Sequence, residues 1–157
     1  MNIMKGLKIK DISLKAKQGQ YGIVFTSWNP SIVQDLLKET KKELISQGVD
    51  EANIYLKEVP GAFELPLATQ FMAEKEGILS VISLGAIIRG DTPHFDFISS
   101  SCLEGLQEVS LKTRIPVICG VLTTNTIEQA EERSDPNKMN KGKEFALTAL
   151  NMVDSLS

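Results

Sequence analysis

The sequence contains few of the residues that metal centres and disulfide scaffolds require. Its 157 residues include two cysteines, one histidine and one tryptophan. The two cysteines, Cys102 and Cys119, are too few and too far apart for a disulfide scaffold or a zinc knuckle. We therefore expect both to be small, buried, apolar side chains.

An excess of basic residues and a long apolar run are also missing. The formal net charge is −3, which argues against a nucleic-acid partner, because binding to nucleic acid depends on a basic patch. The longest apolar run, residues 78–88, is shorter than the roughly 20 residues of a membrane-spanning helix. Residues 1–20 contain no continuous apolar stretch like that of a signal peptide. We therefore expect a cytoplasmic protein with no membrane contact.

Short runs rich in β-branched residues alternate with longer amphipathic segments. Strands are predicted over residues 21–26, 53–59, 78–88 and 116–123, and helices over 30–47, 64–76, 95–114, 126–133 and 140–157. This alternation implies right-handed βαβ units. We predict an α/β fold, a flavodoxin-like three-layer sandwich whose central four-stranded parallel sheet carries helices on both faces. The length predicts a single domain over residues 1–157, with residues 1–20 as an extended N-terminal segment.

Several helix ends have local signals. Asn29 is expected to cap the first long helix, with Pro30 at its first position. Gly48 and Gly77 are plausible C-terminal stops. Thr126 and Gln129 stand three residues apart, as in a capping box.

The predicted topology indicates where a ligand would bind. In a doubly wound sheet, ligands bind beyond the carboxyl ends of the strands, where the strand order reverses. With the strand at 21–26 placed centrally, this rule selects residues 27–30, 60–64 and 89–94.

The segment 85–96 carries the densest group of reactive side chains. His94 is a candidate general acid or base, because its unperturbed pKa lies closest to neutrality. Alternatively, it caps or hydrogen-bonds the backbone of its loop. Asp91, His94 and Asp96 are possible metal ligands, but a zinc site with one histidine and no thiolate would be unusual. We expect no metal, and Asp96 could instead cap the following helix.

Four other side chains each allow two interpretations. Arg133 and Lys141 could hold a phosphate or could be solvated surface charges. Glu64 could accept hydrogen bonds from a heterocycle or could be a first-turn acid favoured by the helix dipole. Trp28 could be a stacking surface or half-buried packing.

These residues lie in four motifs that resemble those of the lumazine synthases. The motifs are VPGAFELP at 59–66, GAIIRGDTPHFDF at 85–97, GVLTTNTIEQAEER at 120–133 and NKG at 140–142. They stand in the order and spacing of that family, so together they are far more specific than any one alone.

The resemblance implies roles for individual residues. His94 would donate and accept protons, and Trp28 would stack on the pyrimidine ring. The residues expected to bind the ribitylaminouracil are Trp28, Ala62, Phe63, Glu64, Ala86, Ile87, Ile88, Cys119 and Lys141. Those expected to bind the butanone phosphate are Asp91, Thr92 and Arg133.

The resemblance also implies a reaction and an assembly. The reaction is that of a transferase, 6,7-dimethyl-8-ribityllumazine synthase, acting at the penultimate step of riboflavin biosynthesis without a cofactor. It condenses 5-amino-6-(D-ribitylamino)uracil with 3,4-dihydroxy-2-butanone 4-phosphate and releases phosphate and water. The partners implied are other copies of the chain, in a pentamer or a multiple of pentamers with sites between subunits, and riboflavin synthase as a candidate. The alternative is a non-catalytic lumazine- or flavin-binding protein on the same fold.

Three features depart from the family pattern. Trp28 stands where phenylalanine is more usual. Cys119 replaces a larger apolar residue that packs on the ring from the adjacent subunit. Residues 134–139 replace a turn that is commonly rich in glycine, and that turn lies where pentamers meet in shell-forming members.

Overall fold

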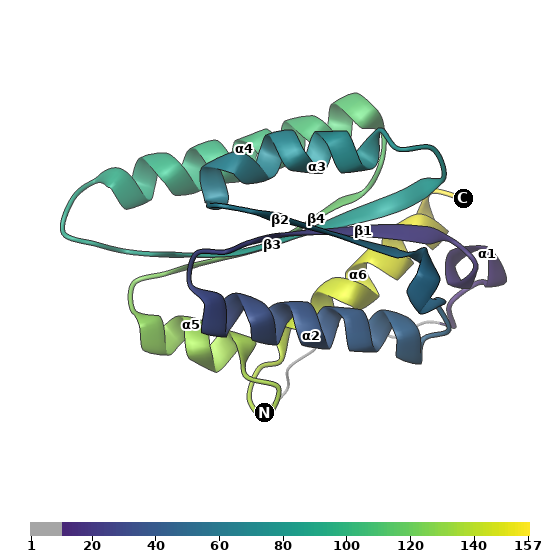
Figure 1. The fold of residues 1–157 in the computed structure, drawn as a ribbon, viewed down its shortest axis with the longest axis horizontal. Helices are drawn as coiled ribbons and strands as arrows, with labels where there is room; N and C mark the ends of the chain where they lie inside the picture. The colour runs from purple at the N-terminus through teal and green to yellow at the C-terminus, as the bar shows by residue number, and fades with distance from the viewer. Residues whose placement is uncertain (1–10) are drawn as a thin grey trace.

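The computed structural model describes residues 11–157. A sheet lies between two layers of helices (Figure 1). In chain order the elements are α1 (Leu14–Lys17), β1 (Gln20–Thr26), α2 (Pro30–Ser46), η1 (Glu51–Asn53), β2 (Ile54–Val59), η2 (Ala62–Glu64), α3 (Leu65–Ala73), β3 (Ile78–Ile88), α4 (His94–Thr113), β4 (Val117–Thr124), α5 (Ile127–Ser134) and α6 (Lys141–Ser155).

The sheet has four parallel strands in the order β2-β1-β3-β4. The chain runs outward from β1 to β2, returns to β3 and continues to β4. The strand order therefore reverses between β1 and β3, whose carboxyl ends leave a crevice there. This arrangement confirms the predicted α/β sandwich and the central position of the first strand.

Alternating side chains divide the core into two layers. On β1, Ile23 and Phe25 pack toward α2 and α6, whereas Val24 packs toward α3 and α4. The helices α3 and α4 cover one face of the sheet, and α2, α5 and α6 cover the other (Figure 1). Both faces of β1 are buried, which explains why its sequence is almost continuously apolar.

Helix ends follow the sequence signals with one exception. Gly48 and Gly77 both have positive φ angles, +110° and +89°, which favour glycine. The capping box of Thr126 and Gln129 is present. Asn29, however, makes no side-chain cap and has a φ of +55°. Its amide donates to the carbonyl of Ala86 instead, at 2.9 Å.

Three further expectations are corrected. Part of the predicted extended N-terminal segment is helical, because Ser13 caps the single turn of α1; residues 1–10 of that segment lie outside the described residues. Asp96 lies inside the first turn of α4 rather than capping it, because Pro93 holds the cap position. Cys102 is buried as expected, but Cys119 is exposed because β4 is an edge strand.

Within residues 11–157, no helix combines the length and apolar character needed to cross a bilayer.

Candidate active site

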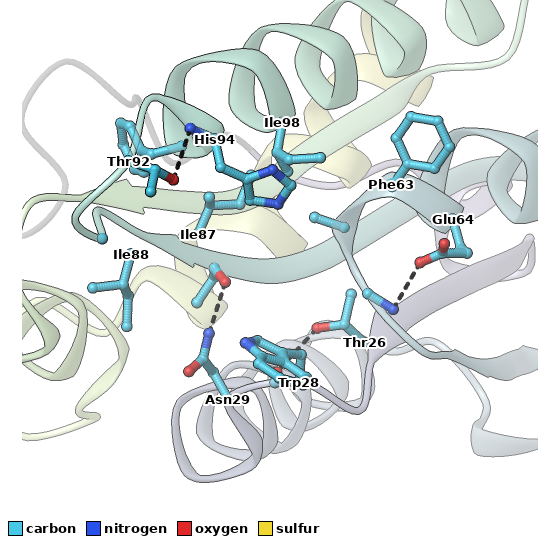
Figure 2. A pocket seen from close by; sticks show the side chains of 15 residues that line it. Thr26, Trp28, Asn29, Phe63, Glu64, Ile87, Ile88, Thr92, His94 and Ile98 are labelled. Atoms are coloured by element: carbon cyan, nitrogen blue, oxygen red, sulfur yellow. Dashed lines mark hydrogen bonds between the residues drawn. The ribbon is translucent and has the colours of Figure 1, made fainter.

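A pocket of about 390 Å³ opens at the carboxyl ends of β1, β2 and β3 (Figure 2). It lies at the crevice where the strand order reverses. Each of the three segments selected from the sequence contributes to its walls. The lining residues are Thr26, Trp28, Asn29, Gly61, Ala62, Phe63, Glu64, Ala86, Ile87, Ile88, Gly90, Thr92, His94, Phe95 and Ile98.

Trp28 forms one wall of the pocket. Its backbone is fixed on both sides, because its N–H donates to Pro60 O at 3.2 Å and its carbonyl accepts from Thr26 Oγ1 at 3.2 Å. Its side chain is nonetheless 72% exposed. The interpretation of Trp28 as a half-buried packing residue is therefore wrong for the single chain. Its indole instead offers an open aromatic face.

Phe63 and Glu64 enter the pocket from the short turn η2. The Phe63 ring is exposed. A Glu64 carboxylate oxygen accepts from the Gly61 N–H at 3.0 Å. This bond closes the turn as a capping contact would, and it leaves the second carboxylate oxygen for another donor.

His94 stands opposite Trp28 across the pocket (Figure 2). It is the first residue of α4 and is exposed. Its backbone N–H is 3.4 Å from Thr92 Oγ1, while its imidazole lines the pocket. The side chain is therefore accessible to a ligand rather than buried. Asp91, in the same loop, is exposed but does not line the pocket.

Three of the candidate residues lie elsewhere. Cys119 is on the edge strand β4, and Lys141 begins α6, where its ammonium pairs with Glu144 at 3.0 Å. Arg133 is half-buried near the end of α5, and one of its guanidinium N–H groups donates to Gln129 O at 2.9 Å. None of these three residues lines the pocket that contains His94.

The pKa values of both thiols are raised, so neither cysteine is suited to act as a nucleophile. Burial, followed by the charge of the neighbouring Cys119, raises the pKa of Cys102 to about 12. Desolvation also raises the pKa of Cys119, although the residue is exposed at its edge strand. Both thiols therefore stay protonated at neutral pH, and a protonated thiol is a poor nucleophile.

The acidic residues of the loop do not assemble a metal centre. Asp96 is directed to Arg89, with 3.4 Å between the carboxylate and the guanidinium. In the part of the chain that the structure describes, no three His, Cys, Asp or Glu residues lie close enough to hold a metal ion.

Six lining residues were not among the sequence candidates: Thr26, Asn29, Gly61, Gly90, Phe95 and Ile98. Asn29, Gly61 and Gly90 fall inside segments that the switch-point rule selected. Asn29 was interpreted only as a cap, and its left-handed backbone conformation has no clear sequence signal beyond the tolerance of asparagine for that region.

The doubly wound fold, with an open aromatic and polar pocket at its switch point, defines a class of small-molecule-binding α/β proteins. A family model narrows this class. The model for 6,7-dimethyl-8-ribityllumazine synthase matches residues 18–157. The chain belongs to that family.

Proposed function

We propose that the chain acts, as a single domain, as a 6,7-dimethyl-8-ribityllumazine synthase. The observation that carries this proposal is the convergence of separate motifs on one pocket. Trp28, Phe63, Glu64, Ile88 and His94 come from three different strand ends, yet all line the same crevice. The family match over residues 18–157 supports the reaction.

The residue types suit the ribitylaminouracil. The exposed indole of Trp28 would stack on the pyrimidine ring, since aromatic rings favour such contacts. Ala62, Phe63 and Glu64 would contact the ring and the ribityl chain. The free oxygen of the Glu64 carboxylate would accept from a donor of the ligand, because a carboxylate has several acceptor positions.

The residue types also suit the chemistry. The 5-amino group of the uracil would attack the ketone to give an imine. Loss of phosphate, tautomerisation and ring closure would follow. Each step moves a proton, and His94 would serve as donor and acceptor, because a neutral imidazole carries one nitrogen that donates a proton and one that accepts. Holding two substrates together would supply much of the acceleration.

We also propose that the site is completed by a second copy of the chain. The phosphate ligands Asp91, Thr92 and Arg133 do not meet at the pocket within one chain, and Cys119 and Lys141 are also outside it. A neighbouring copy could bring its Arg133, Lys141 and Cys119 to the His94 pocket.

The distribution of exposed apolar side chains supports such an assembly. Around β2 and α3, exposed Tyr55, Leu56, Leu67 and Phe71 border a groove of about 670 Å³. All six residues of the edge strand β2 are exposed or half-buried. Apolar surface of this extent is typical of interfaces rather than of monomers.

A second apolar surface is carried by α4. Phe97 and Leu111 are 71% and 70% exposed, and Leu103 is also exposed. The two surfaces consist of different residues, so contact between them would be head-to-tail. Head-to-tail contacts that close generate rings. A pentamer or a multiple of five is the ring that the family implies, and native mass spectrometry would test it: a stable, active monomer would contradict this part of the proposal.

The direct test of the reaction uses both substrates. Purified protein mixed with 5-amino-6-(D-ribitylamino)uracil and 3,4-dihydroxy-2-butanone 4-phosphate is expected to produce lumazine fluorescence and one phosphate per lumazine. A second candidate function is a lumazine or flavin carrier, since the exposed Trp28 would bind either ring. Tight binding of lumazine without any turnover would favour the carrier.

A further inference from the structure

The side chain of Arg89, the first residue after β3, is held in one orientation by three contacts. Its Nε donates to Asn125 Oδ1 at 2.9 Å, and its Nη2 lies 3.4 Å from Asp96 Oδ1. Its guanidinium lies 4.4 Å from the centre of the Phe95 ring. A planar guanidinium that stacks on a ring and donates through separate N–H groups has little freedom to rotate.

The Phe95 contact connects Arg89 to the pocket. Phe95 lines the pocket directly after His94, whereas Arg89 contacts the ring but does not line the pocket. Arg89 therefore meets the pocket through another side chain. Its contacts with Phe95 and Asp96 both join it to the first turn of α4, where the imidazole of His94 is attached.

The Asn125 contact connects Arg89 to α5. The backbone N–H groups of Asn125 and Thr126 donate to the Gln129 amide oxygen at 2.8 and 3.3 Å. The carbonyl of Gln129 accepts from the Arg133 guanidinium at 2.9 Å. A continuous path of hydrogen bonds thus leads from Arg89 through Asn125 and Gln129 to Arg133.

We infer that Arg89 is a positioning residue that holds the His94 loop and the Arg133 helix of one chain in a fixed relation. The inference rests on the proposed function, in which His94 moves protons and Arg133 pairs with the phosphate of the substrate. Among the side-chain hydrogen bonds of residues 11–157, the Arg89–Asn125 bond is the one that joins these two segments. The backbone adds one bond at their base, from the Arg89 N–H to Thr124 O at 2.9 Å. In a ring whose sites lie between subunits, the two segments would serve neighbouring sites, so Arg89 would link one site to the next.

A purely structural role for Arg89 makes a different prediction. The side chains of Arg89 and Asp96 are 46% and 60% exposed, and ion pairs this exposed add little to global stability because water screens them. If Arg89 only stabilised the fold, its loss would have small effects on both stability and turnover. If Arg89 positions the two segments, turnover of the phosphate substrate will fall while the unfolding temperature hardly changes.

The test compares Arg89→Ala, Asn125→Ala and the matched charge control Lys42→Ala, which removes an exposed lysine of α2. Asn125→Ala removes the acceptor without changing any charge. We expect kcat/KM for the butanone phosphate to fall roughly 10- to 100-fold in Arg89→Ala and in Asn125→Ala, with KM for the uracil within about twofold of the control. The double variant is expected to have the same kcat/KM as the more impaired of the two single variants, because both substitutions break the same path of hydrogen bonds.

The inference is overturned if Arg89→Ala and Asn125→Ala match Lys42→Ala, if both substrates lose affinity equally while the unfolding temperature falls, or if the two losses multiply. Calorimetric titration with inorganic phosphate distinguishes a failure of this inference from a failure of the proposed function.

If the wild-type protein produces no lumazine, the proposed reaction alone is refuted. In that event, weaker phosphate binding in Arg89→Ala than in Lys42→Ala still supports the link, and equal binding overturns it.

Discussion

The proposed site has two parts, and the chain holds them in different ways. The first part, with Trp28, Glu64 and His94, is assembled within one chain around a single pocket. The second part, with Arg133 and Lys141, lies on α5 and α6, and both side chains bond within their own helix: Arg133 to Gln129 and Lys141 to Glu144. The pocket is thus formed within one chain, whereas the charges proposed to bind the phosphate lie on other elements.

This difference has a physical explanation. An exposed aromatic ring needs no partner, because water contacts it at modest cost. A guanidinium or ammonium group held in a shielded site without a counter-ion would be costly. In the proposed assembly, placing these charges on a different surface, with partners in their own helices, would avoid that cost until two copies and a phosphate come together. The two parts should therefore respond differently to substitution.

The largest effect is expected at Arg133. Arg133→Ala would remove the proposed charge pair with the phosphate, which is worth about 2–5 kcal/mol in a shielded site. Steady-state kinetics should show a large loss of kcat/KM for the butanone phosphate with little change for the uracil. An equal loss for both substrates would instead indicate a structural role for Arg133.

The next effect is expected at His94. His94→Ala should slow turnover by roughly 10²-fold or less, at the lower end of what general acid–base catalysis contributes. Binding of the uracil should be nearly unchanged, because the imidazole is only one of many lining groups. Full turnover by this variant at saturating substrate would remove His94 from the mechanism.

Trp28 tests the ring-binding part alone. Trp28→Ala should weaken lumazine and riboflavin binding by about 1–3 kcal/mol, the contribution of stacking on an aromatic ring. Trp28→Phe should retain most of that affinity. Since Trp28 is the single tryptophan, its emission reports on the pocket directly. Saturable quenching by ring ligands, corrected with free tryptophan, is expected, and inorganic phosphate should cause little change.

The smallest effect is expected at Cys119. If its edge strand faces the ring ligand from the neighbouring copy, Cys119→Leu should strengthen ring binding by roughly 1 kcal/mol through added apolar contact. Phosphate affinity should stay constant. A change in phosphate affinity with no change for the ring would place Cys119 away from the proposed interface.

Most of the fold could be predicted from the sequence. The runs at 21–26 and 78–88 are rich in β-branched residues, and the structure confirms both as central parallel strands. Because parallel strands fix where their carboxyl ends meet, the pocket could be located from topology alone. The capping box of Thr126 and Gln129 was also recognisable, because it depends only on residue type and spacing.

Other features depend on tertiary contacts that residue type does not determine. Asn29 is a residue type that favours the N-cap position, but its side-chain amide donates to the carbonyl of Ala86, near the end of the neighbouring strand β3. Asp96 could have been a cap or a metal ligand, and Arg89 determines its direction. The exposure of Cys119 follows from the edge position of β4, which the order of strands along the chain does not fix.

The claim that the site needs two copies can be tested most directly by mixing the two impaired variants. In rings assembled at random from His94→Ala and Arg133→Ala subunits, about a quarter of the interfaces would combine an intact His94 with an intact Arg133. Co-expression with two affinity tags, followed by purification of mixed rings, should restore up to about a quarter of wild-type turnover. Mixing His94→Ala with a variant that carries both substitutions should restore nothing. Mixed rings that are no more active than the two parent variants would contradict the account, because both parts of the site would then have to come from one chain.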